Sequence, residues 1–222
     1  MEQKTNFTCD KDNQNYTIND NQSEINYSIS FTGTHQNFCV GIITLEKPKR
    51  YTDFLTRAKH SQIFLNSIAK ILIQFGGFIV KNRDDFMLYY FPQSAKNNKK
   101  YGFISCLESC NELLEERQRI SQSSEKLGLP PINFRISIDF GQTAVMQSSF
   151  SFCPDLLGPT VNICSKINYI APLNSVAVGG DLYEVVKKFN EYKFKNFGQY
   201  SVGLKQPYPV YLLECAPSQC TT

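Results

Sequence analysis

Apolar and polar residues along this chain alternate between two periods, one typical of strands and the other typical of helices. Residues 38–44 form a short apolar run that predicts a buried strand. From 54 to 75 the apolar residues recur near helical spacing, and Gly76 with Gly77 predicts the end of that helix. Two β-prone runs follow, 78–81 and 86–91, and the polar residues between them predict a hairpin.

The second half of the chain continues the alternation. We expect a helix at about 101–124, and Pro130 with Pro131 separates it from the strands that follow. These are a strand at 133–140, then Gly141 and a second strand to about 147. The last expected elements are a helix at 160–169, a strand at 175–178, a helix at 182–189 capped by Asp181, and β-prone stretches at 192–197 and 208–214.

This order of elements predicts the fold class. A β-α-β-β-α-β series with extra C-terminal strands is typical of an α+β fold with a ferredoxin-like core. We expect an antiparallel sheet with helices on one face.

The first 37 residues differ from the rest of the chain. They are rich in Asn and Gln and poor in large apolar residues, so they cannot bury enough surface to offset the entropy lost on ordering. We therefore predict a disordered polar tail at 1–37, one domain at 38–215 and a short tail at 216–222.

Composition and charge exclude several partners. With 23 Lys and Arg against 20 Asp and Glu, a net charge of +3 is too balanced to favour nucleic acid or an anionic membrane. We find no apolar run long enough to cross a membrane and no secretory leader, so we expect a cytoplasmic protein. The eight cysteines include Cys106 and Cys110, which we expect to pack as reduced thiols rather than to bind zinc.

The segment 155–167 is the richest in candidate chemistry. Asp155 precedes a glycine turn, and the helix that follows carries Asn162 and Lys166 four residues apart, on one face. An amide and a cation near a helix N-terminus suit a phosphate. Spacing alone, however, favours the simpler interpretation, which is a solvated helix face.

Two longer motifs resemble those of class III adenylate and guanylate cyclases. That family carries Asp-x-x-Gly-x-x-Val-Asn-x-x-x-Arg at this point, and residues 155–166 match it except that Lys166 replaces the Arg. The family also has Gly-Gly-x-x-x-Lys-x-x-Gly-Asp-x-x-x-x-x-Phe across its hairpin, and residues 76–91 match it except that Asp84 replaces the third Gly. The resemblance runs in the right order over about 38–214, and archaeal-type cyclase-homology domains are the most similar.

The resemblance implies a role for each matched position. Lys81 and Asp155 correspond to the pair that reads the purine edge, in the combination typical of adenine. Asn162 corresponds to the residue that orients the ribose, and Lys166 stands where an Arg stabilises charge on the phosphorus. Lys205 corresponds loosely to a lysine that binds the triphosphate.

The metal site implied by the resemblance is incomplete. Asp85 corresponds to one carboxylate that binds two divalent cations, Mg²⁺ or Mn²⁺. The family's second carboxylate ends the first strand, and here Thr44 stands in its place. Glu46 lies two residues further on and on the same side of the strand, so it is a candidate substitute. Lys166 keeps a positive charge but lacks the planar fork of Arg.

The activity implied is conversion of ATP, less readily GTP, to 3′,5′-cyclic AMP and pyrophosphate. The metal carboxylates and the Asn/Arg helix of these enzymes come from opposite subunits, so we expect a homodimer or a heterodimer with another cyclase domain. Three alternatives stay open. The first is a catalytically inactive regulatory partner that binds nucleotide or dimerises. The second is a purely structural module, and the third is a diguanylate cyclase. The last is disfavoured because Gly179, Gly180 and Asp181 precede a helical pattern instead of forming a hairpin.

Overall fold

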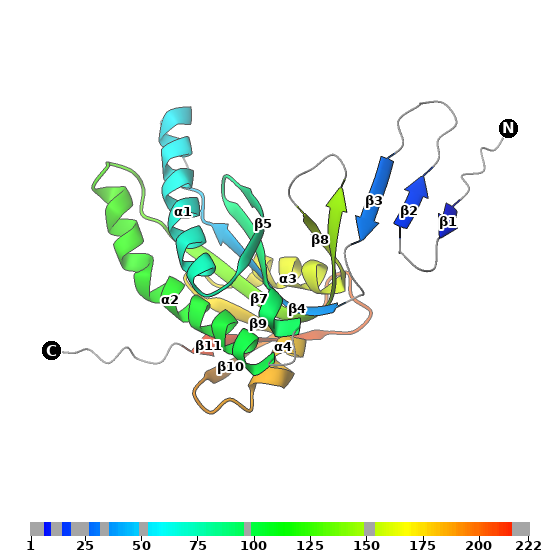
Figure 1. Ribbon diagram of the computed structural model, residues 1–222. Helices are drawn as coiled ribbons and strands as arrows, with labels where there is room; N and C mark the ends of the chain where they lie inside the picture. The colour runs from blue at the N-terminus through cyan, green and yellow to red at the C-terminus, as the bar shows by residue number, and fades with distance from the viewer. Residues whose placement is uncertain are drawn as a thin grey trace.

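A mixed sheet with helices on both faces forms the body of the molecule (Figure 1). The computed structural model describes residues 7–9, 15–18, 27–31, 36–48, 53–95, 99–148 and 154–214. The helices are α1 (Phe54–Gln74), α2 (Lys99–Glu125), α3 (Pro159–Ile170) and α4 (Gly180–Val186), with a short 3₁₀ helix at Pro92–Ala95. None of the helices within these ranges is long and apolar enough to cross a membrane.

The sheet has the order β5-β6-β4-β7-β9-β11-β10. All neighbours are antiparallel except β7 and β9, which are parallel. The strands are β4 (Gln36–Leu45), β5 (Phe78–Arg83), β6 (Phe86–Phe91), β7 (Phe134–Ser148), β9 (Val176–Gly179), β10 (Lys193–Tyr200) and β11 (Tyr208–Glu214). A short strand, β8 (Asp155–Leu157), pairs with the far end of β7.

Strand β4 shows how the two faces of the sheet are filled. Successive side chains of a strand point to opposite faces. One set packs into a core with α1, α2 and α4, and consists of Cys39, Ile43 and Leu45. The alternate set packs with Cys164 of α3, and consists of Phe38, Val40 and Ile42. Helix α3 therefore covers the opposite face from α1 and α2, which lie side by side in Figure 1.

Most predicted elements are confirmed, with small shifts at their ends. The first helix begins after Asp53, whose side chain accepts a hydrogen bond from the Thr56 backbone N–H at 2.8 Å. Gly76 follows its end with a φ of +80°, a conformation that glycine adopts without strain. The hairpin, the second helix and the C-terminal strands also form as expected. Cys106 and Cys110 are buried free thiols, as predicted.

Four expectations are wrong. Helices cover both faces of the sheet because α3 packs on the face opposite α1 and α2, and the sheet is mixed instead of antiparallel. Gly141 does not separate two strands but lies inside the continuous strand β7. Asp181 lies within the first turn of α4, and the residue that caps this helix is Gly179.

The predicted tail at 1–37 contains three short strands. These are β1 (Phe7–Cys9), β2 (Asn15–Ile18) and β3 (Tyr27–Phe31), and β3 pairs with the end of β7. The other residues before 36 lie outside the described ranges, so disorder of this tail stays a prediction, and the short tail predicted at 216–222 also lies outside them.

Candidate functional site

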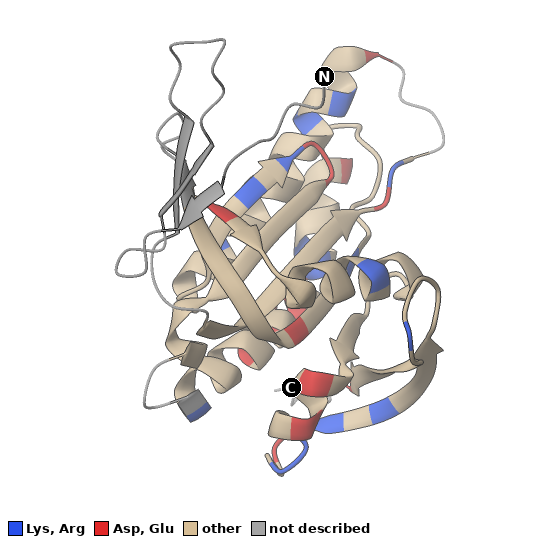
Figure 2. Cartoon of the chain, turned by 90° about the vertical axis from the view of Figure 1, so that its right-hand side faces the viewer, with Lys and Arg blue, Asp and Glu red and all other residues tan. Residues whose placement is uncertain are grey.

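The β5–β6 hairpin carries the first group of predicted site residues. Lys81 lies on β5, and the turn at the hairpin tip contains Asp84 and Asp85. Asp84 has a φ of +25°, which Asp tolerates better than most residues and which explains why a glycine would also fit there. Its carboxylate pairs with Arg57 of α1 at 2.6 Å, so the hairpin tip is tied to that helix. Figure 2 shows acidic residues at the tip with basic residues beside them.

The structure brings Lys81 and Asp155 together. The Lys81 Nζ and the Asp155 Oδ2 are 3.4 Å apart, although the two residues are 74 positions apart in the chain. Each side chain is about half exposed, at 48% and 46%. Asp155 also accepts a hydrogen bond from the Leu156 backbone N–H through Oδ1, which fixes the direction of its carboxylate. A cation and an anion are therefore presented side by side to solvent.

Gly158 lets the chain turn from β8, which carries Asp155, into helix α3. Gly158 has a φ of +149°, and a Cβ there would lie 2.5 Å from the carbonyl oxygen of Gln142 on β7. Only glycine allows the chain to turn so closely against the strand. Asn162 is exposed in the first turns of α3, and Lys166 lies one turn further along.

Lys166 points to the loop between β10 and β11. Its Nζ donates a hydrogen bond to the carbonyl oxygen of Gly203 at 3.2 Å. Lys205 is exposed two residues further along the same loop. The structure therefore places both predicted phosphate-binding lysines at this loop, although they are 39 positions apart in the sequence.

A buried carboxylate anchors the end of the β10–β11 loop. Asp139 of β7 is 1% exposed and accepts hydrogen bonds from the backbone N–H groups of Phe140 and Leu182 and from the hydroxyl of Tyr208, which opens β11. Burial raises the pKa of Asp139 to about 7, against the lowering effect of these three hydrogen bonds.

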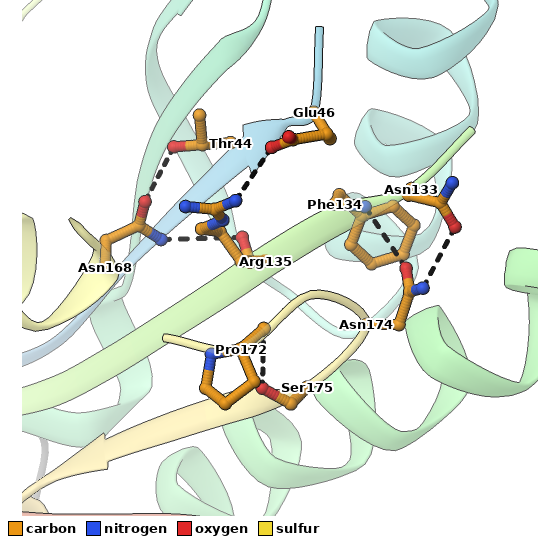
Figure 3. Close-up of polar contacts among 9 residues, drawn as sticks. All are labelled: Thr44, Glu46, Asn133, Phe134, Arg135, Asn168, Pro172, Asn174 and Ser175. Carbon is orange, nitrogen blue, oxygen red and sulfur yellow. Dashed lines mark hydrogen bonds and ion pairs between the residues drawn. The ribbon is translucent and has the colours of Figure 1, made fainter. Parts of the chain in front are cut away.

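Thr44 lies where the missing metal carboxylate is expected, and its hydroxyl is already engaged. It donates a hydrogen bond to the side-chain oxygen of Asn168 on α3 at 2.7 Å (Figure 3). Asn168 is 5% exposed and donates its amide hydrogens to the carbonyl oxygens of Ile42 and Arg135. Thr44 is therefore part of the packing between β4, β7 and α3.

The two nearby carboxylates are paired with cations of the same chain. Glu46, the candidate substitute, forms an ion pair with the guanidinium of Arg135 (Figure 3), at a distance of 2.7 Å. Asp85 lies 2.7 Å from the ammonium of Lys47, and its backbone carbonyl accepts a hydrogen bond from the Leu45 N–H. Within the described ranges, no group of three or more His, Cys, Asp or Glu residues could hold a metal ion.

A cleft of about 550 Å³ opens along the hairpin. Its lining residues are Lys81, Arg83, Asp84, Asp85 and Phe86. The cleft thus joins the Lys81 end of the site to the Asp85 end, and it carries charges of both signs.

Sequence reasoning missed Lys47, Arg135, Asn168 and Asp139. Arg135 lies directly opposite Thr44 in the pairing of β4 with β7, which only the register of the sheet reveals. Asn168 lies six residues after Asn162 on α3 and is buried, whereas Asn162 is exposed. Lys47 was within reach of sequence reasoning, because it follows Glu46 directly.

Several solved structures share this fold, although no protein-family model and no curated protein matches the chain. The adenylyl cyclase CyaB from P. aeruginosa has a TM-score of 0.75 at 16% identity, with 83% of this chain and 97% of that chain covered. The guanylyl cyclase Cya2 has a TM-score of 0.71 at 16% identity, covering 84% and 97%. The guanylate cyclase domain of RhGC from Catenaria anguillulae, in complex with GTP, has a TM-score of 0.65 at 14% identity, covering 82% and 97%. The chain therefore has the fold of class III nucleotide cyclase catalytic domains.

Proposed function

We propose that this chain is a class III nucleotide cyclase-like domain that binds ATP and converts it to 3′,5′-cyclic AMP and pyrophosphate with weakened activity. The observation that carries the proposal is the contact between Lys81 and Asp155 at 3.4 Å. Two motifs far apart in the sequence each supply one member of this pair, and they meet on the surface of the fold that nucleotide cyclases use.

The Lys81–Asp155 pair has the chemistry to recognise adenine. Asp155 accepts a hydrogen bond from an exocyclic amine, and Lys81 donates to a ring nitrogen. Guanine offers a carbonyl oxygen in place of the adenine amine, so it leaves the Asp155 carboxylate facing another acceptor. An unpaired polar contact costs roughly 1–3 kcal/mol, which corresponds to a preference of about tenfold or more for ATP.

Asn162, Lys166 and Lys205 would hold the rest of the nucleotide. An exposed amide on α3 can orient the ribose hydroxyls, and two lysines at the β10–β11 loop can neutralise phosphate oxygens. The Gly203 carbonyl already fixes Lys166, so this cation is positioned before a ligand arrives.

The divalent cations used by this fold family do not fit the residues present at the end of β4. A two-metal site needs shared carboxylates to hold two cations about 3.5–4 Å apart. Here Thr44 is neutral, Glu46 is paired with Arg135, and Asp85 is paired with Lys47. We therefore assign no catalytic step to a metal held by this chain.

A second candidate function follows from this misfit. The chain would act as a catalytically inactive partner that binds ATP with Lys81 and Asp155 and dimerises with another cyclase domain. That partner would supply both metal carboxylates. The observation that favours this function is the Thr44–Asn168 hydrogen bond, which uses the missing ligand's position for packing.

Nucleotide preference tests the proposal. A fluorescent ATP analogue should bind the chain at least about tenfold more tightly than the matching GTP analogue, and Asp155→Ala should remove that preference. Glu125→Ala, which removes an exposed acid on α2, is the matched control and should leave it unchanged. Equal binding of both analogues by the wild type would refute the assignment. Cyclic AMP formation, with and without an added cyclase domain, then separates the two candidate functions.

A further inference from the structure

The acidic edge formed by Glu46 and Asp85 is neutralised by its own chain. The Lys47 ammonium contacts Asp85 at 2.7 Å, and the Arg135 guanidinium contacts Glu46 at the same distance. These pairs are not fully solvated, since the side chains of Asp85 and Arg135 are only 26% and 24% exposed. Partial burial weakens the screening of each pair by water and salt.

The neighbouring residues hold Arg135 in place. Its backbone carbonyl accepts a hydrogen bond from the Asn168 amide, and Asn168 in turn accepts from the Thr44 hydroxyl. Arg135 also lies opposite Thr44 in the antiparallel pairing of β4 and β7. The backbone of Arg135, from which the guanidinium extends, is therefore held both by the sheet and by α3.

A divalent cation would meet strong opposition at this edge. To reach Asp85 it must displace the Lys47 ammonium, which lies 2.7 Å from the carboxylate. The Thr44 hydroxyl offers a neutral oxygen in place of a carboxylate, which Mg²⁺ binds poorly because it gives up its waters reluctantly. Two bound cations would face still greater repulsion.

We propose that Lys47 and Arg135 are internal counter-ions that take the place of divalent cations, so that nucleotide binding by this chain does not use Mg²⁺ or Mn²⁺. The nucleotide part of this inference rests on the proposed function, whereas the absence of metal binding at the edge does not. The edge is an internally neutral surface against which a triphosphate can lie without a metal bridge.

Titration of the 222-residue chain with Mn²⁺, followed by electron paramagnetic resonance without nucleotide, tests the edge directly. The wild type should show no saturable binding below about 1 mM, a weak limit for a carboxylate site. Thr44→Asp combined with Lys47→Ala should create saturable binding at least about tenfold tighter than the wild type, and adding Asp85→Asn should remove it. Lys188→Ala, which removes an exposed lysine after α4, is the matched control and should behave as wild type. Tight Mn²⁺ binding by the wild type that Asp85→Asn abolishes would overturn the inference.

The second arm measures binding of the ATP analogue in EDTA and in 5 mM Mg²⁺. The dissociation constants of the wild type should differ by less than about threefold, because the counter-ions are already present. Lys47→Ala should bind more weakly in EDTA and recover with Mg²⁺, giving a ratio of about tenfold. A wild type that binds only with Mg²⁺ would overturn the inference. A chain that binds no nucleotide in either buffer would refute the proposed function, and the Mn²⁺ titration would still decide the nature of the edge.

Discussion

Replacing Asp139 with Asn should change how the stability of this domain depends on pH. Asp139 is almost fully buried, and its carboxylate holds the start of α4 through the Leu182 N–H at 3.2 Å and the start of β11 through the Tyr208 hydroxyl at 2.8 Å. The cost of burying the charge outweighs these hydrogen bonds, so the pKa of Asp139 is raised from 3.8 to about 7.

The sign of the effect follows from proton binding. Between pH 4 and pH 7 the folded protein keeps a proton on Asp139 that the unfolded chain has lost, so the free energy of unfolding falls as pH rises through this window. A pKa raised from 3.8 to about 7 is equivalent to about 4 kcal/mol across the whole window. Between pH 5 and pH 8 the part lost is about 3 kcal/mol.

Urea unfolding at pH 5 and pH 8 measures this difference. The wild type should lose about 3 kcal/mol more than Asp139→Asn between the two pH values, because Asn does not titrate. The comparison cancels other groups, including His60, whose pKa is lowered by burial and which acts in the opposite direction. Parallel pH profiles for the two proteins would show that Asp139 is ionised throughout, and the reasoning from burial would fail.

Two further predictions concern the site and its assembly. Thr44→Asp alone should raise cyclic AMP formation with Mn²⁺ by less than about threefold, because Lys47 still pairs with Asp85. Thr44→Asp with Lys47→Ala should raise it by at least about tenfold. A large gain from the single change would show that Lys47 does not block the edge. If the nucleotide site is shared between subunits, a benzophenone amino acid at position 162 should cross-link to Asp85 or its neighbours in a second chain. A strictly monomeric protein at high concentration, with and without ATP, would contradict this arrangement.

The local elements were predictable from the sequence where local forces decide them. The periodicity of apolar residues predicts the hairpin and the first helix, and Gly76 predicts where that helix ends. Both elements were confirmed. Gly141 was misinterpreted because its role is tertiary. A Cβ at this position would lie 2.8 Å from the Thr160 hydroxyl, so the glycine lets α3 approach β7 and does not mark a turn. A sequence pattern cannot distinguish these two uses of glycine.

The prediction of where α4 begins was wrong for a related reason. Asp181 has the residue type of an N-cap, but the carboxylate that receives the Leu182 N–H comes from Asp139, 43 positions earlier in the chain. A cap supplied by another strand leaves no local signal. The same holds for the Arg135–Glu46 pair, which depends on the register of β4 against β7. The Lys81–Asp155 contact could be anticipated only because two motifs of one family point to it.

The two ends of the candidate site differ in how their charges are used. Lys81 and Asp155 meet at 3.4 Å with half of each side chain exposed, so a ligand can separate them at little cost. Asp85 and Glu46 meet their cations at 2.7 Å, and one side chain of each pair is about three-quarters buried, so water and salt screen these pairs less. The charges at this edge balance. Thr44 is neutral, and each of the carboxylates of Asp85 and Glu46 has a cation of the same chain beside it. On the proposed function, the open Lys81–Asp155 pair is the part of the site that would read a base, and the paired edge is the part that would not take a metal. A subunit built in this way would be most useful beside a partner that brings its own carboxylates.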